Sequence, residues 1–351
     1  MKVAMLTVLR LDILEQYKFV REYGIEIDVL TNGNEPNYLF GGRKYISQCN
    51  LNEKIINYNN IIDVCSEYDV ITGYEFYGEN QKTIMKNFNN FIPEVAWNIP
   101  TYGTHFGHPD MEALILAKTK VKSFIAKSQS VYDCLVQEGI EKEKIHLVHA
   151  SCDTDRFIPR GKPERLKDKI VFLFVGRLQE QKGIFELFHA FVRAHIPNSK
   201  LILIGPQHPT NPWSVDELKK WAQIKHVDIE IHDYVKPEEI HLFYNWGDVF
   251  ITLPNTGYKF IEQIGLTVPQ ALASGLPVIT NDFGGQVDFI NDSCGFLIPH
   301  KDYVKVAEAM IKLTDLKRRK EMSESARQSA LTKFNLDNYA RHIKNIYETV
   351  L

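Results

Sequence analysis

The chain has 351 residues, with 41 Lys and Arg against 44 Asp and Glu, a net charge of −3 and 44% hydrophobic residues. These values exclude a disordered chain, indicate a globular protein of about two domains, and give no basic excess for nucleic-acid binding. The five cysteines never form a C-x-x-C pair, which disfavours zinc fingers and disulfide scaffolds and indicates a cytoplasmic protein. We find no signal peptide, and no apolar run reaches the ~18 residues of a membrane-spanning helix.

The first half of the chain alternates strand-like and helical segments. An apolar run at 3–9, a helix at 12–23 and a second apolar run at 25–30 give the strand–helix–strand pattern of a parallel sheet. Further strands are predicted at 69–72, 123–126 and 145–149. Asparagine-rich tracts at 57–60 and 86–91 indicate surface connections. We assign residues 1–163 to an N-terminal Rossmann-like domain.

The second half begins after the Pro- and charge-rich linker 158–169 with the continuously apolar run 170–175, which is typical of a parallel strand covered on both faces. Apolar residues from Ile184 to Phe191 then recur at helical spacing. Further strands are predicted at 200–205, 228–232, 248–253, 276–280 and 295–298. We therefore assign 164–335 to a second domain and 336–351 to a helix that crosses back to the first domain. The fold class is α/β, with two doubly wound Rossmann-like domains facing across an interdomain cleft.

The segment VGRLQEQKG (175–183) follows the first strand of the second half. Gly176 allows a tight exit from the strand, and Arg177 and Lys182 place two cations on the loop that leads into the next helix. A strand–helix junction already favours anions through its N–H groups, so this loop is a candidate phosphate site. The alternative is that both cations are simply solvated.

A second candidate segment is IEQIGLTVPQALASGLPVI (261–279). The Glu262 carboxylate suits sugar hydroxyls, which donate hydrogen bonds to it, and it would repel phosphate. Gly265 lets the backbone approach a ligand, and the amides of Gly265 and Leu266 would face an anion at the start of a helix predicted near Thr267. Thr267 and Gln270 also have the spacing of a capping box, which needs no ligand.

Together these segments resemble the donor-site motifs of retaining glycosyltransferases of the GT-B fold, family 4, which carry V-G-R-L…K-G followed by E-x7-E. The segments GGQVDFI (284–290), GFLIP (295–299) and the domain-joining region 124–159 are similar to further motifs of that family. The resemblance runs from about residue 95 to the C-terminus. It implies a hexosyltransferase-type enzyme that moves a sugar from a UDP- or GDP-type nucleotide sugar to an acceptor hydroxyl on a glycan, lipid or small molecule. It also implies that residues 1–163 form the acceptor-side domain and residues 164–335 the donor domain.

The resemblance also implies roles for single residues. Arg177 and Lys182 would hold the donor diphosphate together with the backbone of Gly176, Gly265 and Leu266. Glu262 would position the sugar at the reaction centre. Gln270 stands where the family has a second glutamate that meets the ribose, and its amide can still bond a hydroxyl. The Gly-rich loop that follows the first strand in the family is absent here.

The segment TYGTHFGHPD (101–110) supplies His105, which matches the histidine that the family places near the anomeric carbon. His105, His108 and Asp110 could also bind a metal by ligand type, or His105 could be an ordinary loop histidine. We expect no metal and no cofactor, because relatives neutralise the diphosphate with side chains and backbone amides.

The sequence leaves three questions open: whether the chain contacts a membrane surface, which activity it has, and what its oligomeric state is. Four lysines between Lys118 and Lys127 are either a solvated face or a contact to an anionic membrane surface. A sugar-nucleotide epimerase of the same fold and a non-catalytic sugar-nucleotide-binding protein are the alternatives to a transferase. The oligomeric state is not indicated by the sequence.

Overall fold

The computed structural model describes residues 1–6, 11–33, 43–57, 59–96, 110–207, 214–255 and 261–351. These residues form two compact units, Met1–Ser151 with Leu336–Leu351, and Cys152–Asn335. The segment 152–163, which the sequence analysis placed in the first domain, packs with the second unit. Arg327 of helix α12 (Leu316–Lys333) donates to the carbonyl oxygens of Thr154 and Phe157 at 3.0 and 2.8 Å, which holds this segment there.

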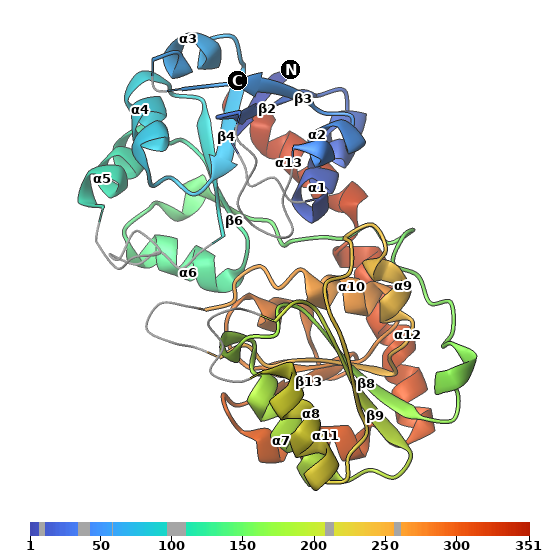
Figure 1. Ribbon diagram of the computed structural model, residues 1–351. Coiled ribbons are helices and arrows are strands. Elements are labelled where there is room, and N and C mark those ends of the chain that lie inside the picture. The colour runs from blue at the N-terminus through green and yellow to red at the C-terminus, as the bar shows by residue number, and fades with distance from the viewer. Residues whose placement is uncertain (7–10, 34–42, 58, 97–109, 208–213, 256–260) are drawn as a thin grey trace. The chain divides into compact units, whose positions relative to one another are not determined.

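The first unit is a seven-stranded parallel sheet in the order β3-β2-β1-β4-β5-β6-β7. Its strands are β1 (Lys2–Leu6), β2 (Glu26–Thr31), β3 (Asn52–Ile55), β4 (Val70–Tyr74), β5 (Phe91–Val95), β6 (Phe124–Ala126) and β7 (Ile145–Leu147). Its helices are α1 (Leu11–Glu22), α2 (Lys44–Gln48), α3 (Ile61–Cys65), α4 (Glu79–Asn87), α5 (Met111–Lys120), α6 (Gln129–Gln137), the short 3-10 helix η1 (Lys142–Lys144) and α13 (Leu336–Glu348). Figure 1 shows α1, α2 and α13 on one face of this sheet and α3 to α6 on the other.

Two strands of this sheet were missing from the sequence analysis. Strand β5 begins inside the Asn-rich tract, and Pro93 and Glu94 interrupt its apolar pattern. Strand β3 is short and mostly polar, as an edge strand of the sheet can be. Although β5 contains the charged residue Glu94, all of its residues are buried, because Glu94 has a charged partner within the core.

That partner is Lys127, whose Nζ lies 2.5 Å from Glu94 Oε2 and donates to the hydroxyl of Tyr339 at 2.8 Å. The two charged side chains are at most 1% exposed, and burial lowers the pKa of Lys127. Tyr339 belongs to α13, so this buried contact ties the C-terminal helix to β5 and to the end of β6. One of the four clustered lysines therefore has a structural role, and Lys118 is engaged as well, because it donates to the carbonyl of Glu138 at 3.1 Å.

The second unit is a six-stranded parallel sheet in the order β10-β9-β8-β11-β12-β13. Its strands are β8 (Ile170–Val175), β9 (Ser199–Ile204), β10 (Ile229–His232), β11 (Val249–Thr252), β12 (Val278–Asn281) and β13 (Gly295–Ile298). Its remaining helices are α7 (Ile184–Ala194), α8 (Val215–Ile224), α9 (Ile240–Tyr244), α10 (Thr267–Ala273), α11 (Tyr303–Lys312) and the 3-10 helices η2 (Glu164–Leu166), η3 (Glu180–Lys182) and η4 (Gly285–Phe289). In Figure 1, α7, α8 and α11 cover one face and α9, α10 and α12 the other.

The predicted strand at 170–175 and the helix from Ile184 are confirmed. Five of the six residues of β8 are buried, as expected for a central parallel strand. The apolar stripe of α7, which includes Leu187, Phe188 and Phe191, packs into the core of the unit. This packing fixes the start of α7 beside the end of β8.

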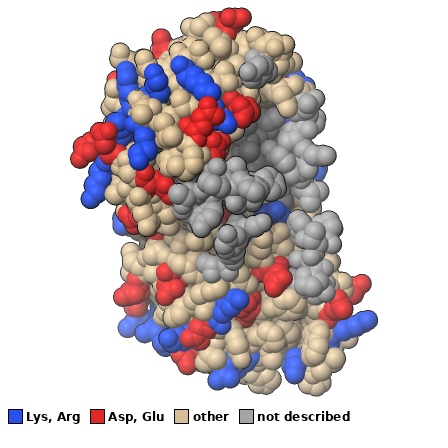
Figure 2. Space-filling view, turned by 90° about the vertical axis from the view of Figure 1, so that its left-hand side faces the viewer, with Lys and Arg blue, Asp and Glu red and all other residues tan. Residues whose placement is uncertain are grey.

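The face of the molecule drawn in Figure 2 shows no dominant charge. Figure 2 shows Lys and Arg mixed with Asp and Glu over the face in view. Within the described ranges, no helix combines the length and the apolar character that crossing a membrane requires.

Candidate functional site

The exit of β8 is built on two glycines that approach each other. Gly176 has a φ of 154°, and its N–H donates to the carbonyl of Ile204 at 2.9 Å. A Cβ on Gly205 would lie 1.9 Å from the carbonyl oxygen of Gly176, so only glycine fits there. Leu178 is buried and its N–H donates to Pro206 at 2.9 Å. Arg177 is thereby held at the carboxyl edge of the sheet with an exposed side chain.

Lys182 is the last residue of η3, and Gly183 alone separates it from α7. Gly183 joins the two helices with a φ of 70°, and a Cβ on it would lie 1.8 Å from the carbonyl oxygen of Leu253. The Lys182 ammonium forms an ion pair with the carboxylate of Glu262, and the two side chains are 17% and 21% exposed. The structure therefore brings together the cation of the first candidate segment and the carboxylate of the second, 80 positions apart.

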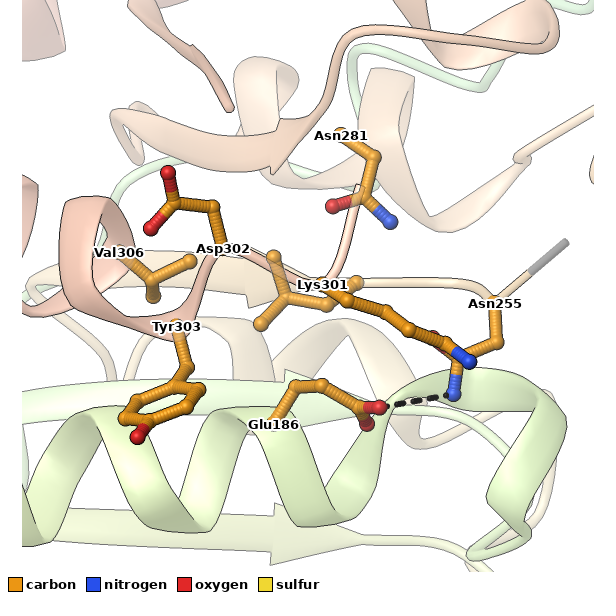
Figure 3. Close-up of a pocket in the computed structure, with 8 residues that line it drawn as sticks. Glu186, Asn255, Asn281, Lys301, Asp302, Tyr303 and Val306 are labelled. Atoms are coloured by element: carbon orange, nitrogen blue, oxygen red, sulfur yellow. Dashed lines mark hydrogen bonds between the residues drawn. The ribbon is translucent and has the colours of Figure 1, made fainter. Parts of the chain in front are cut away.

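The loop that carries Lys182 is supported by Asn255, which the sequence analysis did not identify. The Asn255 side chain donates to the carbonyl of Glu180 at 3.0 Å and to Glu186 Oε1 at 3.2 Å, and its backbone N–H donates to Gln181 at 2.9 Å. Figure 3 shows the bond to Glu186 at the wall of a small pocket. That pocket is lined by Glu186, Leu253, Asn255, Asn281, Lys301, Asp302, Tyr303 and Val306.

Glu262 is positioned by Gly284 and Gly285, which stand at the start of η4, shortly after β12. The N–H of Gly285 donates to the carbonyl of Glu262 at 2.8 Å. A Cβ on Gly285 would lie 1.7 Å from the carbonyl oxygen of Gln263, so the backbones pack directly on each other. Gly265, with a φ of 49°, then turns the chain into α10, of which Leu266 is the N-cap. The helix predicted near Thr267 is confirmed.

The capping-box interpretation of Thr267 and Gln270 is wrong. The N-cap is Leu266, and no side chain caps this helix. Gln270 is instead buried, at 9% exposure, and its Oε1 accepts a hydrogen bond from the hydroxyl of Tyr244 at 2.9 Å. One side of the amide is thus occupied within the unit.

Some sequence-predicted residues lie outside the described part of the chain, namely His105 and His108. Asp110 is described, and its carboxylate caps α5 by accepting from the N–H of Ala113 at 3.0 Å. No cluster of three metal-ligating side chains occurs among the residues that the structure describes.

The described residues therefore place the Arg177 guanidinium at the exit of β8 and pair the Lys182 ammonium with the Glu262 carboxylate on the loops that follow β8 and β11. The cations can hold a phosphate group, while the carboxylate and the Gly265 backbone can accept and donate hydrogen bonds to a polar ligand. Ligands of doubly wound sheets bind at the carboxyl edge of the sheet.

The chain is similar in sequence to several known proteins. The family model described as glycosyl transferases group 1 matches residues 155–329. Over 242 residues the chain is 28% identical to an uncharacterized 41.2 kDa protein in the cps region of Klebsiella pneumoniae, covering 67% of this chain and 63% of that protein. It is 28% identical over 190 residues to a capsular polysaccharide biosynthesis glycosyltransferase, CapM, of Staphylococcus aureus, covering 53% of this chain and 48% of that protein. The matches thus span about half to two thirds of these relatives.

The fold has a solved counterpart. The crystal structure of Anabaena HepE in complex with UDP and glucose superposes with a TM-score of 0.78 and 15% identity, covering 99% of this chain and all of that one. Residues 155–329 therefore match the glycosyl transferases group 1 family, and the chain has the GT-B fold of two Rossmann-like domains.

Proposed function

We propose that this protein is a retaining glycosyltransferase of family 4 that transfers a hexose from a nucleotide diphosphate sugar to an acceptor hydroxyl. The observation that carries the proposal is the ion pair between Lys182 and Glu262, which joins the first candidate segment to the second. A diphosphate sugar needs both kinds of group, cations for its phosphates and a hydrogen-bond acceptor for its hydroxyls.

In this proposal Arg177, Lys182 and the amides of Gly265 and Leu266 bind the diphosphate and stabilise the charge that develops on it as it leaves. Glu262 accepts hydrogen bonds from the sugar. Gln270 contacts the ribose through its NH2 group, because its oxygen is engaged by Tyr244.

The reaction breaks the bond between the anomeric carbon and the diphosphate oxygen and forms one to the acceptor oxygen on the same face of the sugar. The acceptor proton passes to the departing phosphate, so no protein nucleophile is needed. His105, which lies outside the described residues, would assist near the anomeric carbon. Because side chains and amides neutralise the diphosphate, we propose that no metal or other cofactor takes part.

The relatives favour a transferase over the alternatives in one respect. CapM is named as a glycosyltransferase of capsular polysaccharide biosynthesis, and an Escherichia coli relative is named as an enzyme acting on a diphosphoundecaprenol acceptor. By analogy the acceptor here is a glycan or a lipid-linked sugar, and a peripheral contact with the membrane surface follows from a lipid-linked acceptor. An epimerase or a binding protein of this fold would not need an acceptor.

The test is calorimetric titration with UDP and GDP, followed by turnover of the radiolabelled nucleotide sugar with and without n-octyl β-glucoside, in the presence of EDTA. A transferase binds one diphosphate and moves label to the acceptor. An epimerase changes the sugar without an acceptor. A binding protein binds a diphosphate but neither transfers nor changes the sugar. Failure to bind either diphosphate at millimolar concentration would refute the donor site.

A further inference from the structure

Gln286, in η4, carries a buried amide that the protein itself does not satisfy. Its side chain is 1% exposed. Within the described ranges of the chain, no group forms a hydrogen bond with either its Oε1 or its Nε2. An amide offers two donors and an acceptor, and each one buried without a partner destabilises the folded state. Native structures retain such groups where something other than folding requires them.

The position of Gln286 indicates what that requirement is. A Cβ placed on Gly265 would lie 3.8 Å from its Cβ and 4.0 Å from its Oε1, and one on Gly284 would lie 3.4 Å from its Oε1. The same Cβ on Gly284 would lie 2.4 Å from the carbonyl oxygen of Glu262. The amide therefore lies along the backbone that joins Glu262 to Gly265, the segment to which the proposed function assigns the sugar and the diphosphate.

We infer that Gln286 is a specificity-determining residue that hydrogen-bonds the hydroxyls of the transferred sugar, an assignment that rests on the proposed function. Two neighbouring sugar hydroxyls can satisfy both amide atoms, because each hydroxyl donates and accepts. A phosphate oxygen only accepts, so it would satisfy Nε2 and leave Oε1 unpaired. Gln286 thus supplies the donor that the Glu262 carboxylate lacks.

The burial of the amide adds a condition to sugar binding. Since the side chain is closed to solvent, a sugar reaches it only if the adjoining backbone at Gly265 and Gly284 moves. Both residues have positive φ angles, 49° and 73°, and no side chain to obstruct such a movement. In this inference the conformation with an accessible Gln286 amide is stabilised by the sugar, which bonds the amide. The nucleoside diphosphate alone makes no such contact and does not stabilise it.

The test is the variant Gln286→Met, which keeps the length of the side chain and removes its hydrogen bonds. The wild type is first titrated with UDP, UDP-glucose, GDP and GDP-mannose, and the pair in which the sugar adds most affinity is used. We expect Q286M to lower the affinity for the nucleotide sugar at least tenfold and to leave that for the diphosphate within twofold. The melting temperature of the unliganded variant should equal or exceed that of the wild type, because an unsatisfied amide is gone.

The matched control is Gln16→Met, in α1 of the other unit. Gln16 is also buried, at 2% exposure, and its side chain or backbone is engaged by partners. Q16M should leave both affinities unchanged, because Gln16 belongs to the other unit. The inference is overturned if Q286M has a lower melting temperature than the wild type, if it retains the affinity for the nucleotide sugar, if it loses both affinities equally, or if no sugar changes the wild-type affinity. A wild type that binds neither diphosphate overturns the proposed function itself.

Discussion

The variant Glu262→Gln tests whether the ion pair with Lys182 competes with the donor. Lys182 can contact a phosphate only by leaving the Glu262 carboxylate, at least in part. The two side chains are 17% and 21% exposed, so solvent screens their attraction poorly. The free energy of the ion pair should therefore lie between that of an exposed pair, at most about 1 kcal/mol, and that of a charge-assisted hydrogen bond, about 1.5–3 kcal/mol. We take about 1–2 kcal/mol for the contact that binding must break.

Removing that competition should tighten binding of the diphosphate alone. A gain of about 1–2 kcal/mol is about 5- to 30-fold in Kd for UDP, or for GDP if that is the nucleotide used. The nucleotide sugar should gain less or lose affinity, because its hydroxyls lose the carboxylate acceptor. Isothermal titration of the diphosphate and the nucleotide sugar against wild type and E262Q gives both numbers.

The control is Glu180→Gln, which makes the same change of charge at an exposed position on the same loop. Diphosphate binding should barely change in E180Q. If E180Q gains as much as E262Q, the effect is one of overall charge. If E262Q weakens the diphosphate and the nucleotide sugar equally, Glu262 does not compete for Lys182 and the exchange described here is wrong.

Three further outcomes follow from the site and its support. Arg177→Ala and Lys182→Ala should each weaken diphosphate binding about tenfold or more in the same titration, since each removes a charge-assisted phosphate contact of about 1.5–3 kcal/mol, and unchanged affinity would contradict the donor site. Gly285→Ala should lower both the melting temperature and the nucleotide-sugar affinity, because its Cβ would lie 1.7 Å from a carbonyl oxygen, whereas Gly161→Ala, with open space around it, should change stability only. At Glu230 burial raises the carboxyl pKa, but hydrogen bonds from three basic partners outweigh it and lower the pKa to about 2. Its stabilisation is therefore complete above about pH 4.5 and is lost towards pH 2, so acid unfolding of Glu230→Gln should show a shallower loss over that window.

The fold was predictable where one physical signal dominated. Strand β8 and helix α7 have apolar patterns that nothing interrupts, and both lie where the sequence places them. Strand β5 was missed because Glu94 looks like a surface residue until its partner is known. Lys127 stands 33 positions later in the chain, and only the pairing of β5 with β6 brings the two together.

The candidate site was predictable in residue types and not in contacts. The motifs identify Lys182 and Glu262 as residues that meet a donor, but their direct ion pair depends on β8 and β11 being neighbours in the sheet. Asn255 and Gln286 gave no signal, because the role of an amide side chain is recognised only by the partners that it has or lacks. For the same reason the spacing of Gln270 suggested a cap that the helix does not have.

Gln270 provides the sharpest comparison of resemblance with structure. The variant Gln270→Glu restores the family carboxylate but puts it at a position 9% exposed, where the Tyr244 hydroxyl is the donor 2.9 Å away. Lost hydration should raise the pKa of this carboxyl in the folded state above its unfolded value. The folded variant then resists ionisation, so its stability should match the wild type in acid and fall behind as the pH rises.

Urea unfolding at pH 5 and pH 8 measures this directly, with Gln223→Glu on the exposed face of α8 as the charge control. We expect the difference in unfolding free energy between wild type and Q270E to be larger at pH 8, and that for Q223E to be the same at both. A difference that does not depend on pH, together with tighter binding of the diphosphate, would mean that the site accepts an ionised group. The ribose contact implied by the family would then include the side-chain oxygen of residue 270 that accepts the hydrogen bond of Tyr244 in the structure.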